Sequence, residues 1–203
     1  MTTLGVAGGL AAFGPVAWYI FVMSATPGPN NAMLAASGMN FGVRATAPHI
    51  AGIAGGLVAL LAACAFGLGV IFQEIAGAKL ALSIAGACYL AYLAWRVANA
   101  GAPSAAEGGR PLSFWEAASF QFLNPKGWVM ALTAATMAPG GDAPIVAAAA
   151  LGLVGVCVGL PSMGVWAFFG AGLARAFRDP TARRVINYAL AILLLATIPF
   201  MFD

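Results

Sequence analysis

Charged side chains are scarce in this sequence. Only 7% of the 203 residues are charged, whereas 62% are hydrophobic, and soluble domains carry about 25% charged residues. So few polar groups cannot cover a soluble surface without causing aggregation. A disordered chain is excluded for the opposite reason, because its apolar content would be low. The composition therefore predicts a polytopic membrane protein with lipid as a partner along its sides.

Cysteine and histidine, which build metal and redox sites, are nearly missing. The three cysteines, Cys64, Cys88 and Cys157, lie inside apolar runs and form no CxxC pair, and His49 is the one histidine. Such cysteines are typical of a hydrophobic core, and we expect His49 to lie at the membrane interface. The sequence thus predicts no metal site, no cofactor and no catalytic residue.

Basic residues are missing from the start of the chain. The first 43 residues contain no lysine or arginine, so the basic region of a cleavable signal peptide is lacking and we expect the first apolar run to be a retained span. The net charge of +3 would suggest nucleic acid for a soluble protein. In a membrane chain, basic residues set the topology instead, and we predict no nucleic-acid partner.

Six long apolar segments remain once turns and charges divide the chain. They are almost continuously apolar for about 20 residues or more, which is typical of membrane-spanning helices rather than of alternating barrel strands. We predict an all-α membrane protein with six transmembrane helices in a single transmembrane domain, 1–203. The segments cover about residues 10–39, 45–72, 78–98, 114–138, 145–173 and 184–202.

Two of these segments are interrupted near the middle by proline beside asparagine. The first breaks at Pro27-Gly28-Pro29-Asn30-Asn31 and the fourth at Asn124-Pro125-Lys126. Each comes first in a half with three spans, so the second half must be inverted. We predict two inverted repeats, 1–99 and 111–203, joined by a loop at 100–110, with helices 1 and 4 broken. Interrupted helices at matching positions indicate the binding site of a transporter.

The two breaks supply groups that suit a small zwitterion. Proline removes a backbone donor and opens the helix, and the half-helix after Pro29 directs its N–H groups at the break, where a carboxylate is favoured. Asn30, Asn31, Gln121 and Asn124 add donors and acceptors for an amine or a polar side chain.

A lysine stands beside the second break. Lys126 is about twelve residues into the fourth span, and a charge near the midplane costs ~2.5–3.5 kcal/mol on insertion scales. A site that binds an anion, or a lysine that loses its proton, would explain why a lysine is present at this depth. The alternative is that the Lys126 side chain snorkels to the membrane interface. The predicted substrate site consists of Pro27, Gly28, Pro29, Asn30, Asn31, Gln121, Asn124, Pro125 and Lys126.

The arginines fall in three links that share one side of the predicted topology. The positive-inside rule places this side in the cytoplasm and both termini outside. These residues are Arg44, Arg96, Arg110, Arg175, Arg178, Arg183 and Arg184. Two GxxxG motifs, Gly52–Gly56 and Gly155–Gly159, allow close helix approach within the chain or in a homodimer, and both readings stay open.

The motifs together resemble a known family. The stretch 25–31 (ATPGPNN), followed by Gly38, Gly42 and Arg44, is similar to the signature of the LysE/RhtB amino-acid exporters. Stretches 85–96 (AGACYLAYLAWR) and 122–126 (FLNPK) follow in the order of that family. The resemblance covers essentially the whole chain, and stretch 111–115 (PLSFW) looks closest to the cysteine/O-acetylserine exporter subgroup. Gly127 departs from the alanine that often follows NPK in the family.

This resemblance implies an exporter of amino acids or close derivatives in a bacterial cytoplasmic (inner) membrane. Coupling to the proton gradient is usual for such exporters. The family's site residues correspond to Pro27, Gly28, Pro29, Asn30, Asn124, Pro125 and Lys126. Three alternatives stay open: a membrane redox enzyme, for which the cysteines lie far from both breaks, a non-transporting membrane scaffold, and a channel.

Overall fold

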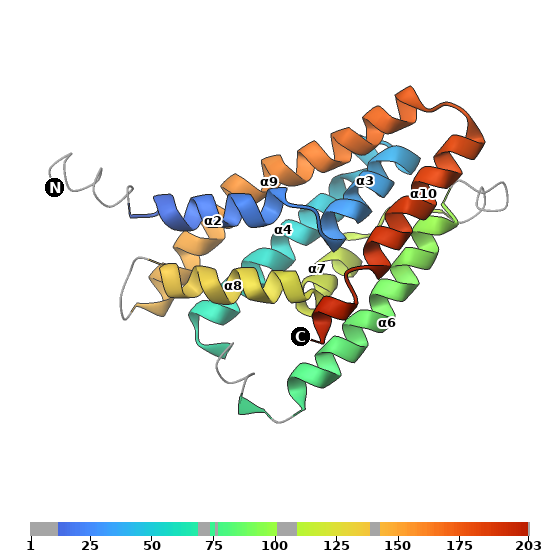
Figure 1. Ribbon diagram of the computed structural model, residues 1–203. Helices are drawn as coiled ribbons and strands as arrows, with labels where there is room; N and C mark the ends of the chain where they lie inside the picture. Colours follow the sequence, from blue (N-terminus) through green and yellow to red (C-terminus); the bar gives the residue numbers. More distant parts are fainter. Residues whose placement is uncertain (1–11, 69–73, 76, 101–108, 139–142, 203) are drawn as a thin grey trace, which may run out of the picture.

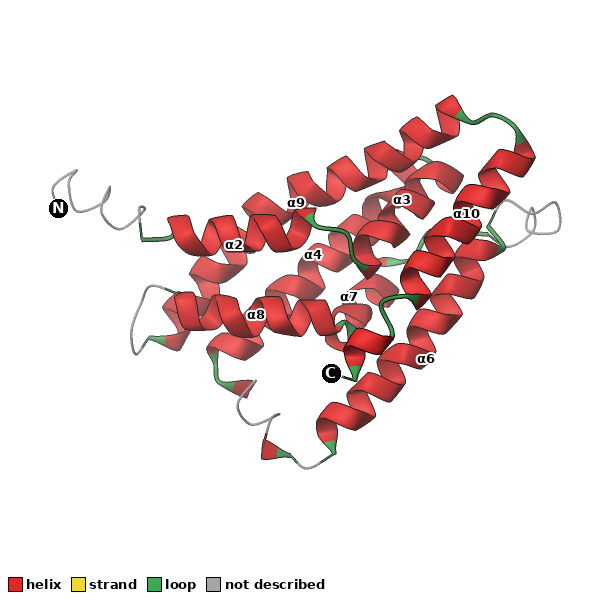
Figure 2. Ribbon diagram, viewed as in Figure 1, coloured by secondary structure: helices red, strands yellow, loops and turns green. Residues whose placement is uncertain are grey.

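The computed structural model describes residues 12–68, 74–75, 77–100, 109–138 and 143–202 (Figure 1). The described residues are helical, and no strand occurs among them (Figure 2). The elements are α2 (Gly14–Ala25), α3 (Pro29–Phe41), α4 (Val43–Ala65), α6 (Ala78–Ala98), α7 (Phe114–Leu123), α8 (Pro125–Met137), α9 (Pro144–Ala176), α10 (Pro180–Leu195) and the 3-10 helix η2 (Pro199–Met201). Within the predicted loop at 100–110, residues 101–108 lie outside the described ranges.

Four stretches are long and apolar enough to cross a membrane. They are Val43–Ala65, Lys79–Ala98, Pro144–Ala176 and Pro180–Met201. The two remaining segments are each divided into a pair of shorter helices, α2 with α3 and α7 with α8. Both predicted interruptions are therefore present, at the predicted residues.

The predicted segment boundaries need correction in three places. The second segment was expected to reach residue 72, but α4 ends at Ala65, and Gly67 then adopts a left-handed backbone with φ 81°, which glycine tolerates. The fifth begins and ends slightly outside 145–173, because α9 runs from Pro144 to Ala176, through Pro161 without a break.

The last segment also differs from its expected range of 184–202. Helix α10 begins at Pro180, since the Asp179 carboxylate caps it by accepting from the Ala182 N–H at 2.8 Å. The helix ends at Leu195, and η2 follows from Pro199. Proline has no N–H and cannot extend the preceding α-helix.

Helix α4 is the most buried of the four long helices. Helix α9 packs against α2, α3 and α4, and α4 packs against α7 and α8. Glycine allows these contacts: a Cβ at Gly52 or Gly56 would overlap the backbone of α7, and one at Gly155 would lie 2.9 Å from Leu61 Cδ1 of α4. Both GxxxG motifs therefore serve packing inside this chain.

The links that carry arginine meet at one end of the bundle (Figure 1). Asn40 near the end of α3 bonds Asn187 of α10, and Asn187 donates to the Ala100 carbonyl just after α6. Arg96 of α6 also contacts the segment before α7 by donating to the Arg110 carbonyl. We call this the arginine-rich end, and its arginines are Arg44, Arg96, Arg110, Arg175, Arg178, Arg183 and Arg184.

Candidate functional site

The first break separates α2 from α3 by three residues. Helix α2 ends at Ala25, Thr26 and Gly28 are extended, and Pro29 occupies the first turn of α3. Pro27 and Pro29 have no N–H groups, so the α-helical bond pattern cannot pass through this segment. The carbonyls at the end of α2 consequently lose their helical partners, and inside a membrane each needs a replacement.

Side chains supply these replacements. Asn31 Nδ2 donates to the carbonyls of Ser24 at 3.0 Å and Thr26 at 2.6 Å. Trp166 of α9 donates through Nε1 to the Ala25 carbonyl at 3.3 Å. The first break is therefore held open by donors from α3 and from a helix 141 residues away in sequence.

Lys126 crosses from the second break to the first. Its Nζ donates to the Thr26 carbonyl at 2.7 Å, to Thr26 Oγ1 at 2.9 Å and to the Pro27 carbonyl at 3.2 Å. Gly28 leaves room for this side chain, since a Cβ there would lie 3.0 Å from Lys126 Cδ. The ammonium group is thus directed into the break, not along a snorkelling path to the interface.

The second break is narrow and mostly satisfies itself. Asn124 is its one extended residue, and its Oδ1 accepts from the Lys126 N–H at 3.2 Å and so caps α8. Trp128 Nε1 donates to the Phe122 carbonyl at 2.8 Å. Pro125 stands in the first turn of α8, where its missing N–H has no helical partner to lose.

A pair of amides joins the two broken helices. Asn30 Nδ2 donates to Gln121 Oε1 at 3.1 Å, and Gln121 Nε2 donates to Asn30 Oδ1 at 3.2 Å. Gln121 is 1% exposed, so both ends of its amide are held away from water. This reciprocal pair satisfies each amide with the other.

A small cavity of about 40 Å³ lies at this junction. Seven of the nine predicted site residues line it, and Pro27 and Pro125 do not. The seven are Gly28, Pro29, Asn30, Asn31, Gln121, Asn124 and Lys126. The volume holds water but is far below the roughly 300–1,000 Å³ of ligand pockets. Seven of the predicted residues are therefore together, around a space that is too small for an amino acid in this arrangement.

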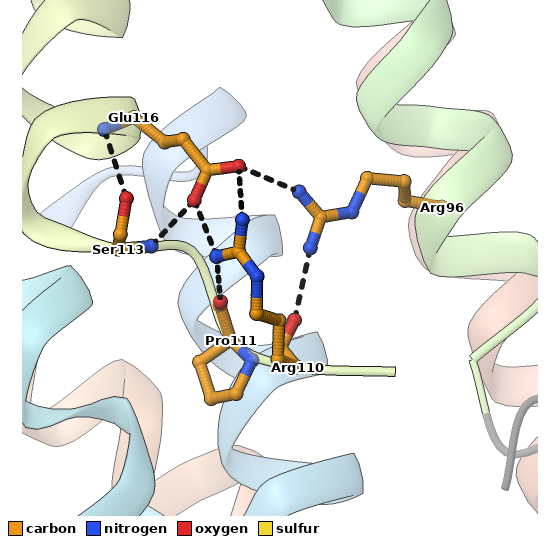
Figure 3. A network of polar contacts seen from close by, with 5 residues as sticks. All are labelled: Arg96, Arg110, Pro111, Ser113 and Glu116. Atoms are coloured by element: carbon orange, nitrogen blue, oxygen red, sulfur yellow. Dashed lines mark hydrogen bonds and ion pairs between the residues drawn. The ribbon is translucent and has the colours of Figure 1, made fainter. Parts of the chain in front are cut away.

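A charged cluster that the sequence analysis missed lies at the arginine-rich end (Figure 3). The Glu116 carboxylate pairs with Arg110 at 2.6 Å and with Arg96 at 3.3 Å. It also accepts from the Ser113 N–H, while Ser113 Oγ accepts from the Glu116 N–H, which makes a capping box for α7. The Ser-x-x-Glu spacing at 113–116 is the signal that could have found it.

Glu116 keeps the neighbouring cations in place. Its hydrogen bond and its charge raise the pKa of the exposed Arg110 guanidinium. Arg96 meanwhile donates to the Arg110 carbonyl at 2.9 Å. The cluster therefore ties the end of α6 to the start of α7 through charge-assisted hydrogen bonds.

His49, which the sequence predicts at the membrane interface, is buried inside the bundle near its arginine-rich end. Its side chain is 1% exposed, and neither ring nitrogen has a hydrogen-bond partner among the described residues. It lines a second cavity, of about 390 Å³, together with Met33, Ser37, Asn40, Arg96 and Arg110. This cavity lies at the arginine-rich end of the bundle.

Comparison with known proteins matches the sequence to a family of transporters. A family model described as "LysE type translocator" matches residues 21–197. This chain belongs to the LysE family. The resemblance drawn from the PGPN and NPK motifs is thereby confirmed, and this LysE-family chain is a multi-pass membrane protein.

Curated relatives of this LysE-family chain share one printed name. "Cysteine/O-acetylserine efflux protein" of Escherichia coli strain K12 is 34% identical over 187 residues, which is 87% of this chain and 90% of the relative. The protein of the same name from Escherichia coli O139:H28 is 34% identical over 188 residues, with the same coverage. The one from Shigella flexneri matches equally over 187 residues. No solved structure gives a significant match.

Proposed function

We propose that this LysE-family chain exports small amino acids or their close derivatives across the bacterial cytoplasmic membrane by alternating access. The observation that carries the proposal is the junction of two broken helices, where Lys126 of one break bonds carbonyls of the other. Interrupted helices at matching positions are typical of secondary transporters. The names of the relatives favour neutral substrates such as cysteine and O-acetylserine.

The proposed fold has six spans in one domain, 1–203. The pairs α2–α3 and α7–α8 each form one broken span and complete the four long ones. Residues 1–99 and 111–203 are then two inverted repeats. The arginine-rich end faces the cytoplasm under the positive-inside rule, so both termini lie outside.

Substrate binds at the junction in this proposal, once the junction widens. The carboxylate meets the N–H groups at the start of α3 and the Lys126 ammonium, which exchanges carbonyl partners for a stronger charged one. The substrate ammonium meets oxygens of Asn30, Asn31, Gln121 and Asn124. Such export requires no catalytic residue, metal or cofactor, and protons are the proposed coupling ion.

Efflux from loaded proteoliposomes tests this function. Vesicles loaded with labelled O-acetyl-L-serine, L-cysteine, L-leucine or L-lysine are compared for wild type, Asn30→Ala, Lys126→Ala and the control Cys88→Ala, whose side chain is exposed. We expect efflux of the small neutral substrates from wild type and control, stimulated by a proton gradient, and at least a tenfold loss in both site variants. Wild-type rates in both variants would contradict the site.

Access to the breaks separates a transporter from a non-transporting scaffold. Gly28→Cys and Asn124→Cys, each in a background without the three native cysteines, are treated with a water-soluble thiol reagent from either side. A transporter gives labelling that substrate changes, whereas a scaffold gives none.

A further inference from the structure

The 390 Å³ cavity at the arginine-rich end has the size of a ligand pocket. One face of α3 forms part of its wall, through Met33, Ser37 and Asn40. The same face continues to Asn30, three residues before Met33 and about one helical turn further in. The cavity and the junction of the breaks therefore lie along one face of α3, and the Asn30–Gln121 pair lines the junction.

The buried polar side chains that line this cavity already have partners, with one exception. Ser37 bonds Thr46 at 2.8 Å, and Asn40 bonds Asn187 and the Ala36 carbonyl. Arg96 and Arg110 bind Glu116 but also line the cavity as cations. His49 alone among the buried side chains of the described residues has polar atoms without any partner.

The ring nitrogens of His49 have almost no accessible surface, so this histidine can select the chemistry of a ligand only once its ring turns into the cavity. A neutral imidazole carries one N–H donor and one nitrogen acceptor, and leaving both unpaired in a buried place is unfavourable. An amino acid offers a carboxylate to the donor and an ammonium to the acceptor. Two guanidinium groups on the same wall attract the carboxylate further.

We propose that this cavity is a loading site for small zwitterionic amino acids, in which His49 contacts the ligand directly. The inference rests on the proposed export function. It adds to the junction a second binding site, which lies on the cytoplasmic side in the proposed topology. The ligand would occupy the cavity first and pass to the junction when the Asn30–Gln121 pair opens.

A single histidine in the chain makes the test direct. The protein is purified through a tag without histidine, labelled with ¹⁵N-histidine and placed in nanodiscs, so that its imidazole signals belong to His49 alone. We expect O-acetyl-L-serine to shift both ring signals along a saturable curve. Acetate or ethylammonium, each with half of the zwitterion, should give less than a third of that shift. Unchanged signals at concentrations that support transport would overturn the proposal and indicate a water-filled cavity.

Two substitutions distinguish a direct contact between His49 and the ligand from a purely structural role of His49. His49→Leu removes both polar atoms, whereas His49→Gln keeps one donor and one acceptor, and Cys64→Ala changes a buried residue at the far end of α4 as the control. We expect His49→Leu to weaken binding of labelled O-acetyl-L-serine about tenfold or more, with His49→Gln intermediate and the control unchanged. Equal affinity in all four proteins would overturn the proposal.

The two proposals fail differently. If wild type exports O-acetyl-L-serine while the His49 signals and the affinity of His49→Leu are unchanged, export stands and the loading site is wrong. If wild type neither binds nor exports any of the four amino acids, the export function is itself wrong, and the loading site falls with it.

Discussion

Both helix breaks of this protein leave backbone carbonyls without their helical partners, and the replacement donors come from different places at the two breaks. At the first, the carbonyls of Ser24, Ala25 and Thr26 accept from the side chains of Asn31, Trp166 and Lys126. At the second, the donors come from residues within a few positions of Asn124.

This difference tells where each break draws its stability. The second is built by its own short segment and needs nothing from other helices to keep its shape. The first depends on donors from α3, α8 and α9, so any movement of these helices changes its hydrogen bonds. The first break is the one whose geometry can respond to a substrate.

Removing the Lys126 ammonium should have the largest effect. Lys126→Met takes away donors to Thr26 and Pro27, and bonds from charged groups contribute about 1.5–3 kcal/mol each. Because this side chain is half-buried, we expect a loss of about 2 kcal/mol in unfolding free energy and at least tenfold slower efflux. Chemical denaturation in detergent and vesicle efflux measure the two. Arg44→Met, at an exposed cation of α4, is the control, and an equal loss there would contradict the assignment.

Replacing asparagine by aspartate should lower the stability of the protein at the first break much more than at the second. Asn31 donates to two carbonyls, so Asn31→Asp loses the donor and places a carboxylate against them, at a cost of about 2 kcal/mol. Asn124 instead accepts an N–H through Oδ1, so Asn124→Asp should stay within about 0.5 kcal/mol of wild type. Thermal unfolding of both variants checks this, and similar losses at the two positions would refute the contrast.

The amide pair that joins the breaks should show coupling. Asn30→Ala or Gln121→Ala leaves the other amide without its partner, at a cost of about 1–2 kcal/mol each. The double variant should be less destabilised than the sum of the single ones, by about 1 kcal/mol. Denaturation midpoints of the four proteins measure this, and strict additivity would mean that the pair contributes nothing as a pair.

The smallest effect is expected at the cap of the second break. Asn124→Ala removes one capping bond, which is worth about 1 kcal/mol. The local segment keeps its other bonds, including that from Trp128 to Phe122. Loss of the cap alone would leave efflux within about twofold of wild type, and we expect a larger loss because the proposed site also places the Asn124 oxygen at the substrate ammonium. Efflux and unfolding measured on the same preparation distinguish the two.

Local chemistry explains which parts of this structure could be predicted. Proline and asparagine at 27–31 and 124–126 set the breaks through missing N–H groups and capping, which depend on near neighbours in sequence. The reach of Lys126 to Thr26 could not be predicted, because it joins residues 100 positions apart. The burial of His49 depends in the same way on α3 and α6, whose positions the sequence pattern does not give.

Long-range electrostatics were the hardest to foresee. Glu116 is the third residue of α7 and its spacing from Ser113 indicates only a cap. Its pairing with Arg96 requires α6 and α7 to meet at their ends. The early end of α4 at Ala65 was likewise hidden, since the residues beyond it are as apolar as those before it.

The glycines that bring backbones together also determine which helices are held in the closest contact. Gly52 and Gly56 of α4 touch α7, while Gly38 of α3 and Gly170 of α9 touch each other's helix. Each contact joins one helix from residues 1–99 to one from 111–203, with no side chain between them to act as a bearing. Helices from opposite halves thus form the closest backbone contacts among these glycines, so a movement of one half against the other would have to separate backbones that touch directly.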